Sequence, residues 1–153
     1  MGKMLDDHNL LKRIFGIGYF LMLFFAVLGI RLFPAFNFRV SHGYNLDLLK
    51  NVSDFGITKD NISLLSRFDW CMNIIMFFFF PFALRSLVPG ARIYKIIVLA
   101  IFSSISIELM QYILDVGLAD INDVIANSIG GVLGSMVISI FDKFRKRQPI
   151  KLT

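Results

Sequence analysis

Long runs of apolar residues, separated by short polar segments, dominate the pattern along the chain. A helix needs about 20 apolar residues to cross a lipid bilayer, with a lower limit near 17. The runs predict spanning helices at about 14–33, 68–84, 93–114 and 120–141. Basic residues before the first run also suit a signal peptide, but no small-x-small cleavage site follows it. We therefore expect a retained first helix and a bundle of about four.

Prolines and glycines between the runs predict where the helices break. Pro81 lies near the end of the second span and should kink or terminate it there, because proline lacks the amide hydrogen. Residues 86–91, which contain a Pro-Gly pair, predict a turn between two helices. Residues 115–119 predict a tight connection, which would make the last two helices an antiparallel hairpin.

One long polar segment, residues 31–67, separates the first two spans. Several aliphatic residues are scattered through it, enough for a short helix on the membrane surface. They are Leu46, Leu48, Leu49, Ile62, Leu64 and Leu65.

The composition agrees with lipid as the solvent. Of the 153 residues, 56% are hydrophobic and only 18% charged, and the mean hydropathy is +0.69. A soluble domain carries about 45–50% apolar and about 25% charged residues. Intrinsic disorder, a disulfide scaffold (Cys71 is the only cysteine) and an enzyme with an aqueous surface are excluded. The sequence predicts an all-α membrane protein with a segment 1–13, a membrane domain 14–141 and a basic tail 142–153.

The basic residues predict the orientation of the chain. The net charge is +5, but Lys and Arg flank the apolar runs, which favours anionic lipid over nucleic acid as their partner. Eleven lie in residues 1–13, 85–95 and the tail, against five in the 31–67 loop and none in the 115–119 turn. The positive-inside rule then places both termini in the cytoplasm and the long loop outside. We expect a multi-pass protein of the bacterial plasma membrane.

Polar side chains within the last two spans gather on single faces. Glu108 and Gln111 are three residues apart, and Asp120, Asp123 and Asn127 follow the spacing i, i+3, i+7. An ionisable group at mid-span costs roughly 2.5–3.5 kcal/mol on insertion scales, so these positions require a reason.

Helical rise predicts that these faces meet. At about 1.5 Å per residue, Glu108 and Asn127 lie about 9 and 10 Å from the outer helix ends and should be level. The same geometry pairs Gln111 with Asp123 and Asp115 with Asp120. The result would be a polar pocket open to the outside. Its predicted lining is Asn73, Glu108, Gln111, Asp120, Asp123 and Asn127.

Small residues next to the expected pocket indicate close packing of helices. Gly130 and Gly134 form a Gly-x-x-x-Gly motif, with Gly131 on the neighbouring row. Ala100 and Ser104 stand eight and four residues before Glu108, on a small-residue row of the third helix.

The residue types leave several chemistries open. Asp120 alone is best explained as a helix cap, which does not account for Glu108. Carboxylates and amides together suit a divalent cation such as Mg²⁺, although no cofactor is required, and isolated His8 and His42 give no zinc site. Glu108 and Asp123 could act as acid and base if their pKa values were pushed apart.

The segment from Asn73 to Gly134 resembles the VanZ-like family of bacterial membrane proteins, whose namesake is associated with teicoplanin resistance. The resemblance rests on Asn73 with Phe77 and Pro81, on Glu108-Leu-Met-Gln111, and on Asp120-Ile-Asn-Asp123-Val-Ile-Ala-Asn127-Ser-Ile-Gly130-Gly131 with Gly134. It implies a role at the cell envelope and reduced sensitivity to such antibiotics.

Four hypotheses follow for the function. In the first, the pocket engages an envelope lipid, a lipid-linked cell-wall precursor or a cation. In the second, the protein is a membrane enzyme acting on a lipid-linked substrate. The third is a small lipid or proton-coupled transporter, and the fourth a scaffold without chemistry. A homo-oligomer is compatible with each, because four short helices cannot bury a large cavity unaided.

Overall fold

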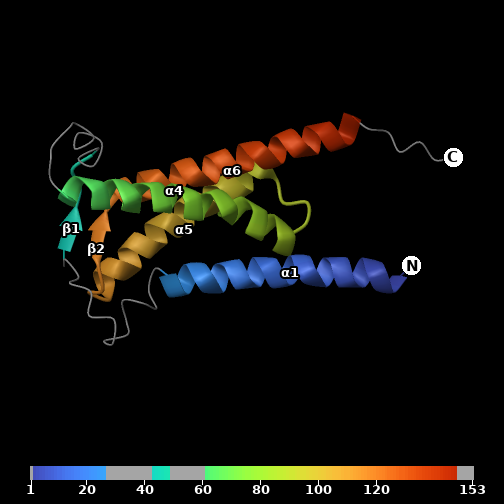
Figure 1. Cartoon of the computed structure of the whole chain (residues 1–153), viewed down its shortest axis with the longest axis horizontal. Helices are drawn as coiled ribbons and strands as arrows, with labels where there is room; N and C mark the ends of the chain where they lie inside the picture. The colour runs from blue at the N-terminus through green and yellow to red at the C-terminus, as the bar shows by residue number, and fades with distance from the viewer. Residues whose placement is uncertain (1, 27–42, 49–60, 148–153) are drawn as a thin grey trace.

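The computed structural model describes residues 2–26, 43–48 and 61–147 (Figure 1). Within these ranges the chain forms four long helices and two short strands. The helices are α1 (Gly2–Phe24), α4 (Asn61–Leu87), α5 (Ile93–Ile113) and α6 (Ile121–Arg147), and the strands are β1 (Gly43–Asn45) and β2 (Leu118–Asp120). In the described part of the chain, three segments are long and apolar enough to cross a membrane: Phe68–Leu87, Ile93–Ile113 and Ile121–Arg145.

The first predicted span is only partly within the described residues. Helix α1 begins at Gly2, twelve residues before the predicted start, so the polar N-terminal segment and the first apolar residues form one continuous helix. Residues 27–33 of the predicted span lie outside the described part of the chain. Of the four spans that we expected, the structure therefore supports three by length and composition.

Pro81 does not terminate α4, which continues to Leu87. Proline removes one helix hydrogen bond, and a helix inside a membrane bundle tolerates this when its neighbours hold the backbone in place. The Pro81 side chain is buried, and its Cγ lies against the Gly134 position of α6. The ribbon of α4 bends in its second half instead of ending (Figure 1).

The expected surface helix between the first two spans is not present in the described residues. Ile62, Leu64 and Leu65 belong to α4, which begins at Asn61 and not near residue 68. Leu46 and Leu48 follow β1, and Leu49 lies outside the described residues. The sequence missed this because a polar first turn looks like loop when only the apolar run is used to find the helix.

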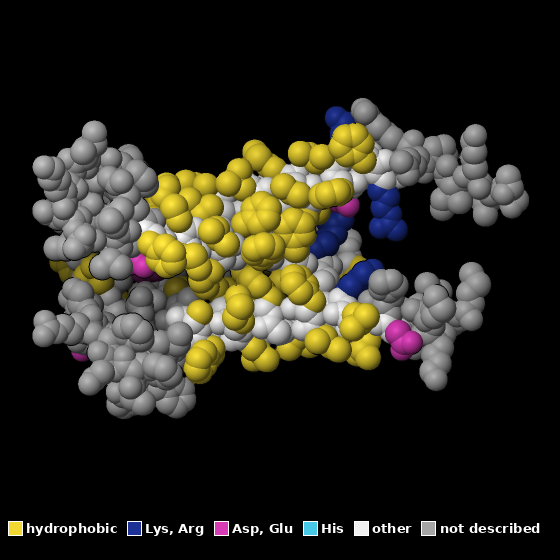
Figure 2. Space-filling view, in the orientation of Figure 1, with side chains coloured by type: hydrophobic (Ala, Val, Ile, Leu, Met, Phe, Trp, Pro, Cys, Tyr) yellow, Lys and Arg dark blue, Asp and Glu magenta, His cyan; other side chains and the backbone are white. Residues whose placement is uncertain are grey.

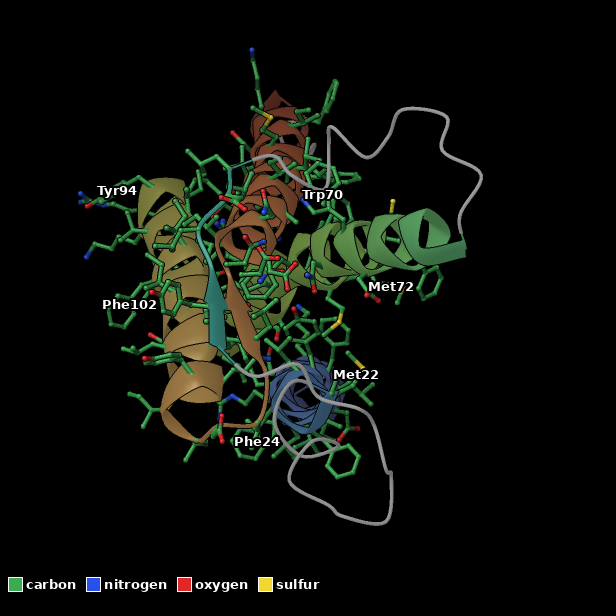
Figure 3. All side chains as sticks on the ribbon, turned by 90° about the vertical axis from the view of Figure 1, so that its left-hand side faces the viewer. Met22, Phe24, Trp70, Met72, Tyr94 and Phe102 are labelled. Carbon is green, nitrogen blue, oxygen red and sulfur yellow. The ribbon has the colours of Figure 1, made fainter. Side chains whose placement is uncertain are left out.

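The outer surface of the bundle is apolar, while several polar side chains are inside. Large hydrophobic side chains cover the visible face of the helices (Figure 2), and Phe102, which is 66% exposed, points away from the other helices together with Tyr94 (Figure 3). The buried polar residues are Ser104, Glu108, Gln111, Asn122, Asn127 and Ser135. This distribution is stable in lipid, where apolar groups need no burial and polar groups need internal partners.

Helix α1 packs against α4 through an aromatic contact and a glycine. The Tyr19 hydroxyl donates to the Met76 carbonyl oxygen at 2.6 Å, and the Phe20 and Phe80 rings meet edge to face at 5.2 Å. A Cβ at Gly16 would lie 2.7 Å from Leu87 Cγ, so only glycine allows this close approach. The start of α1 and the end of α6 lie at the same end of the bundle (Figure 1).

The predicted turn between α4 and α5 is confirmed at residues 88–91. The Ala91 N–H donates to the Val88 carbonyl oxygen at 3.2 Å, and Gly90 has φ 87°. Proline at the second position and a left-handed glycine at the third are typical of a type II turn. The turn reverses the chain so that α5 can pack beside α6.

Helix α5 ends in a Schellman motif in which an aspartate takes the usual place of glycine. Asp115 has φ 53°, its N–H donates to the Tyr112 carbonyl oxygen at 3.2 Å, and the Val116 N–H donates to the Gln111 carbonyl oxygen at 3.1 Å. These two hydrogen bonds satisfy carbonyl groups of the last turn that have no partner within the helix. Aspartate tolerates the left-handed region better than most residues because its short side chain bonds locally.

We expect Asp115→Gly to stabilise the protein by up to about 1 kcal/mol, and Asp115→Val to destabilise it by about 1–2 kcal/mol, because a branched Cβ clashes in the left-handed region. Asp115→Asn should be close to neutral. The measurement is the free energy of unfolding in mixed detergent and sodium dodecyl sulfate. Equal stability of the glycine and valine variants would contradict the left-handed cap.

Candidate functional site

Two three-residue strands lie across the end of the bundle where α5 ends and α6 begins (Figures 1 and 3). Strand β1 pairs in parallel with β2, with Gly43 opposite Leu118 and Asn45 opposite Asp120. The sequence did not predict them, because three residues are too few for an alternating pattern to show. The pairing fixes a piece of the long polar segment onto the start of α6.

Asp120 is the centre of the hydrogen bonds at this end. Its Oδ1 accepts from the backbone N–H of Asn122 at 2.8 Å and from Asn122 Nδ2, also at 2.8 Å. Its Oδ2 accepts from Asn45 Nδ2 at 2.9 Å. Because α6 begins at Ile121, Asp120 is the N-cap of that helix, the role that the sequence favoured for it.

Asn122 connects the cap to the polar segment, and sequence reasoning did not single it out. It is only 1% exposed, and its Nδ2 also donates to the Asp47 carbonyl oxygen at 2.9 Å. The Asp47 N–H in turn donates to Asn45 Oδ1 at 3.1 Å. The signal that could have found Asn122 is its position two residues after a cap, within the Asp-Ile-Asn-Asp stretch. We call Asn45, Glu108, Asp120 and Asn122 the polar cluster.

Glu108 joins the polar cluster from α5. Its side chain is 7% exposed, and its Oε2 accepts from the backbone N–H of Asp120 at 2.9 Å. Free N–H groups at a helix N-terminus carry partial positive charge, so the start of α6 stabilises a carboxylate at this position. This contact explains how a carboxyl group can be buried within an apolar helix that offers no neighbouring Lys or Arg in its own sequence.

The predicted pairing of Glu108 with Asn127 is wrong by about one helical turn. Asn127 Nδ2 donates to Ser104 Oγ at 2.9 Å, and Ser104 lies one turn before Glu108 on α5. Glu108 meets Asp120 instead.

The connection between α5 and α6 differs from the tight turn that we expected to lead directly into the helix at Asp120. Residues 118–120 form β2, which runs across the end of the bundle (Figure 1). The offset between α5 and α6 is therefore set by the course of this strand and not by a minimal turn.

The remaining residues of the expected pocket lie on three helices. Gln111 is buried in the last turn of α5, Asp123 is half-buried in the first turn of α6, and both make interactions within the protein. Asn73, on α4, precedes Ile74, whose carbonyl oxygen faces the Gly130 position of α6. Of the six residues, Glu108 and Asp120 are in contact, whereas Asn127 contacts Ser104.

Below the polar cluster, glycines bring α6 against two other helices. A Cβ at Gly130 would meet the Ile74 carbonyl oxygen, and one at Gly134 would meet the Phe78 carbonyl oxygen. Gly131 faces the other way, where a Cβ would lie 2.8 Å from that of Ala100 on α5. The Gly-x-x-x-Gly row is thus the contact with α4, and Gly131 is the contact with the small-residue row of α5.

The side chains at the end of the bundle that carries the polar cluster offer mainly hydrogen-bond acceptors. Carboxylate oxygens accept only, and Asn127 Oδ1, in a residue that is 4% exposed, is buried without a hydrogen-bond partner. Among the described residues no group of three His, Cys, Asp or Glu could hold a metal ion. Acid/base chemistry by Glu108 and Asp123 stays a prediction.

Comparison with protein families finds a match to the family described as VanZ/LLP1 over residues 14–142. The match includes every residue of the expected pocket, and together with the apolar helices it fits a membrane protein. No curated protein and no solved structure matches the chain.

Proposed function

The chain belongs to the VanZ/LLP1 family, and from this membership and the polar cluster we propose that it lowers the sensitivity of the bacterial envelope to teicoplanin-type glycopeptides. It acts as a multi-pass protein of the plasma membrane, with the polar cluster on the outer side. Its ligand there is an envelope lipid or a lipid-linked cell-wall precursor.

The buried Glu108 carboxyl group is the observation that carries this proposal. A carboxyl group that only stabilised the fold could be replaced by a neutral residue at less cost, because burial of charge is expensive. Here it is positioned by the N-terminus of α6, at the end of the bundle where the strands attach the long polar segment. It is thus held in place beside the residues that attach the polar segment, where we place the ligand.

The acceptors of this end favour a ligand rich in hydrogen-bond donors. Glu108, Asp120 and Asn127 present oxygen atoms, and the hydroxyl groups of sugars and the amide groups of peptides are the matching donors. A lipid-linked precursor carries both, together with an apolar tail for the membrane. A divalent cation has less support, since the described residues offer no three-ligand group.

The test is growth under teicoplanin and vancomycin of a susceptible Gram-positive host that expresses wild type, Glu108→Gln or Asp123→Asn at matched membrane levels. Glutamine keeps an oxygen that can accept from the Asp120 N–H. It removes the charge and replaces the second carboxylate oxygen with an NH2 donor. We expect wild type to protect and both variants to lose the protection. A hydrogen bond to a charged group contributes about 1.5–3 kcal/mol, so ligand affinity should fall about tenfold or more.

Asp115→Asn is the matched control, because it removes a carboxylate at the same end of the bundle from an exposed residue. It should protect as wild type does. Protection that survives in both Glu108→Gln and Asp123→Asn would exclude Glu108 of the polar cluster and the neighbouring Asp123 as ligand-binding residues. Absence of protection by wild type would refute the resistance role.

A further inference from the structure

A second polar region lies at the opposite end of the bundle, where the start of α1 and the end of α6 diverge. A cavity of about 630 Å³ opens there between α1, α4 and α6. Figure 2 shows the hollow between the ends of α6 and α1, with Lys and Arg side chains on its walls. Four cationic side chains from three helices line it, Lys12, Arg13, Arg85 and Arg145. We call it the basic cavity.

Arg85 is the fixed part of the basic cavity. One guanidinium nitrogen donates to Asp142 Oδ2 at 2.7 Å and another to the Ala91 carbonyl oxygen at 3.0 Å. These bonds orient the group between α4, α6 and the turn. Asp142 offsets one of the four cations, which leaves three positive charges in excess around the cavity.

Among the side chains that the structure describes, the other carboxylate near this end belongs to Asp7, which lines a neighbouring hollow with Arg13. Lys12, Arg13 and Arg145 are exposed, and the net repulsion between them is unfavourable unless an anion enters. The cavity therefore has the charge, and with several hundred cubic ångströms the size, of a site for a small anionic group.

Exposed apolar side chains lie close in sequence to the cationic residues of the basic cavity and favour one kind of anion. Leu10 and Ile14 on α1, and Phe141 and Phe144 on α6, lie within a few residues of the cationic side chains and are exposed. A soluble anion makes no favourable contact with these apolar side chains, whereas the acyl chains of a lipid can pack along them. Basic hollows between helices at the cytoplasmic side are a recurrent site for anionic lipid headgroups.

We propose that the basic cavity binds the phosphate of an anionic phospholipid headgroup. Arg85, held by Asp142 and Ala91, and the exposed side chains of Lys12, Arg13 and Arg145 donate to the phosphate oxygens. The acyl chains lie against the exposed apolar residues of α1 and α6. The bound lipid joins the two helix ends that the structure leaves apart, at the opposite end from the polar cluster.

The test uses the purified full-length protein in a neutral detergent, with lipid retention measured by native mass spectrometry. Phosphatidylglycerol, phosphatidylcholine and inorganic phosphate are the probes. The variant is Arg13→Gln/Arg145→Gln, which leaves the Arg85 bonds intact. The control is Arg92→Gln/Lys95→Gln, which removes two charges from side chains that line a different hollow beside the same turn. Circular dichroism and gel filtration establish that each variant is folded.

We expect wild type and the control to retain phosphatidylglycerol in preference to phosphatidylcholine, and inorganic phosphate not to displace it. Each charge near a lipid surface changes binding about fivefold, so Arg13→Gln/Arg145→Gln should weaken retention about tenfold or more. Equal retention of the two lipids, or equal losses in the two double variants, would overturn the proposal. Displacement by inorganic phosphate would overturn the lipid as the ligand and assign a soluble phosphate. All outcomes are independent of the antibiotic phenotype.

Discussion

Replacing Gly134 by valine should prevent the protein from accumulating in folded form. Any Cβ at this position meets the Phe78 carbonyl oxygen of α4, and Pro81 Cγ lies 3.2 Å away. A flexible side chain could move aside, but a helix carbonyl moves only with its helix. The loss of folding free energy should therefore exceed the typical cost of overpacking, about 1–3 kcal/mol. Helix α4 would separate from α6.

The glycines of this chain provide a graded series to test that expectation. Gly134→Ala and Gly130→Ala face backbone atoms, Gly131→Ala faces the Cβ of Ala100, and Gly18→Ala has nothing within 4 Å. We expect folded yield and resistance to unfolding by sodium dodecyl sulfate to fall most for the first two. Gly18→Ala should be neutral or slightly stabilising, since alanine favours the helix. If Gly18→Ala and Gly134→Ala behaved alike, the contact between α4 and α6 would not have the described closeness.

The apolar runs predicted the last two helices well because the change from apolar to polar residues at the boundaries of each run is abrupt. The third run, expected at 93–114, is Ile93–Ile113, and the fourth, expected to begin at Asp120, begins at Ile121. The C-terminal bound differs by more than one residue only in α6, which continues beyond its apolar part. Helix α6 extends to Arg147 through the basic residues, since nothing in Asp142–Arg147 breaks a helix.

The sequence predicted the helices that carry these polar residues but not the register between the helices. Glu108, Asp120 and Asn127 have buried or half-buried positions on the expected helices, yet Glu108 pairs with Asp120 and Asn127 with Ser104. Helical rise along each sequence is reliable, but the offset between two helices depends on how the connection runs. A three-residue strand that pairs with a segment over seventy residues earlier leaves no local pattern in the sequence.

Replacing Asp120 by alanine should cost about 2–4 kcal/mol of stability, the second large effect that we expect. The helix loses its N-cap, which contributes about 0.5–2 kcal/mol, and the buried amide of Asn122 loses an acceptor, which costs about 1–3 kcal/mol. Asn45 loses its bond to α6 as well, so β1 should detach from β2. The measurements are the free energy of unfolding and hydrogen exchange of residues 43–48.

Asp120→Asn distinguishes the contribution of the helix cap from that of the negative charge. Asparagine caps a helix as well as aspartate does and keeps one acceptor oxygen. It should retain most of the stability, but its amide nitrogen replaces an oxygen that accepts from Asn122 or Asn45, so exchange at 43–48 should rise partway. Increased exchange confined to the start of α6 in Asp120→Ala, with 43–48 unchanged, would show that the strands hold without the cap. The pair of variants thus measures how far one side chain connects the polar segment to the bundle, and with it the positioning of Glu108 beside the Asp120 N–H.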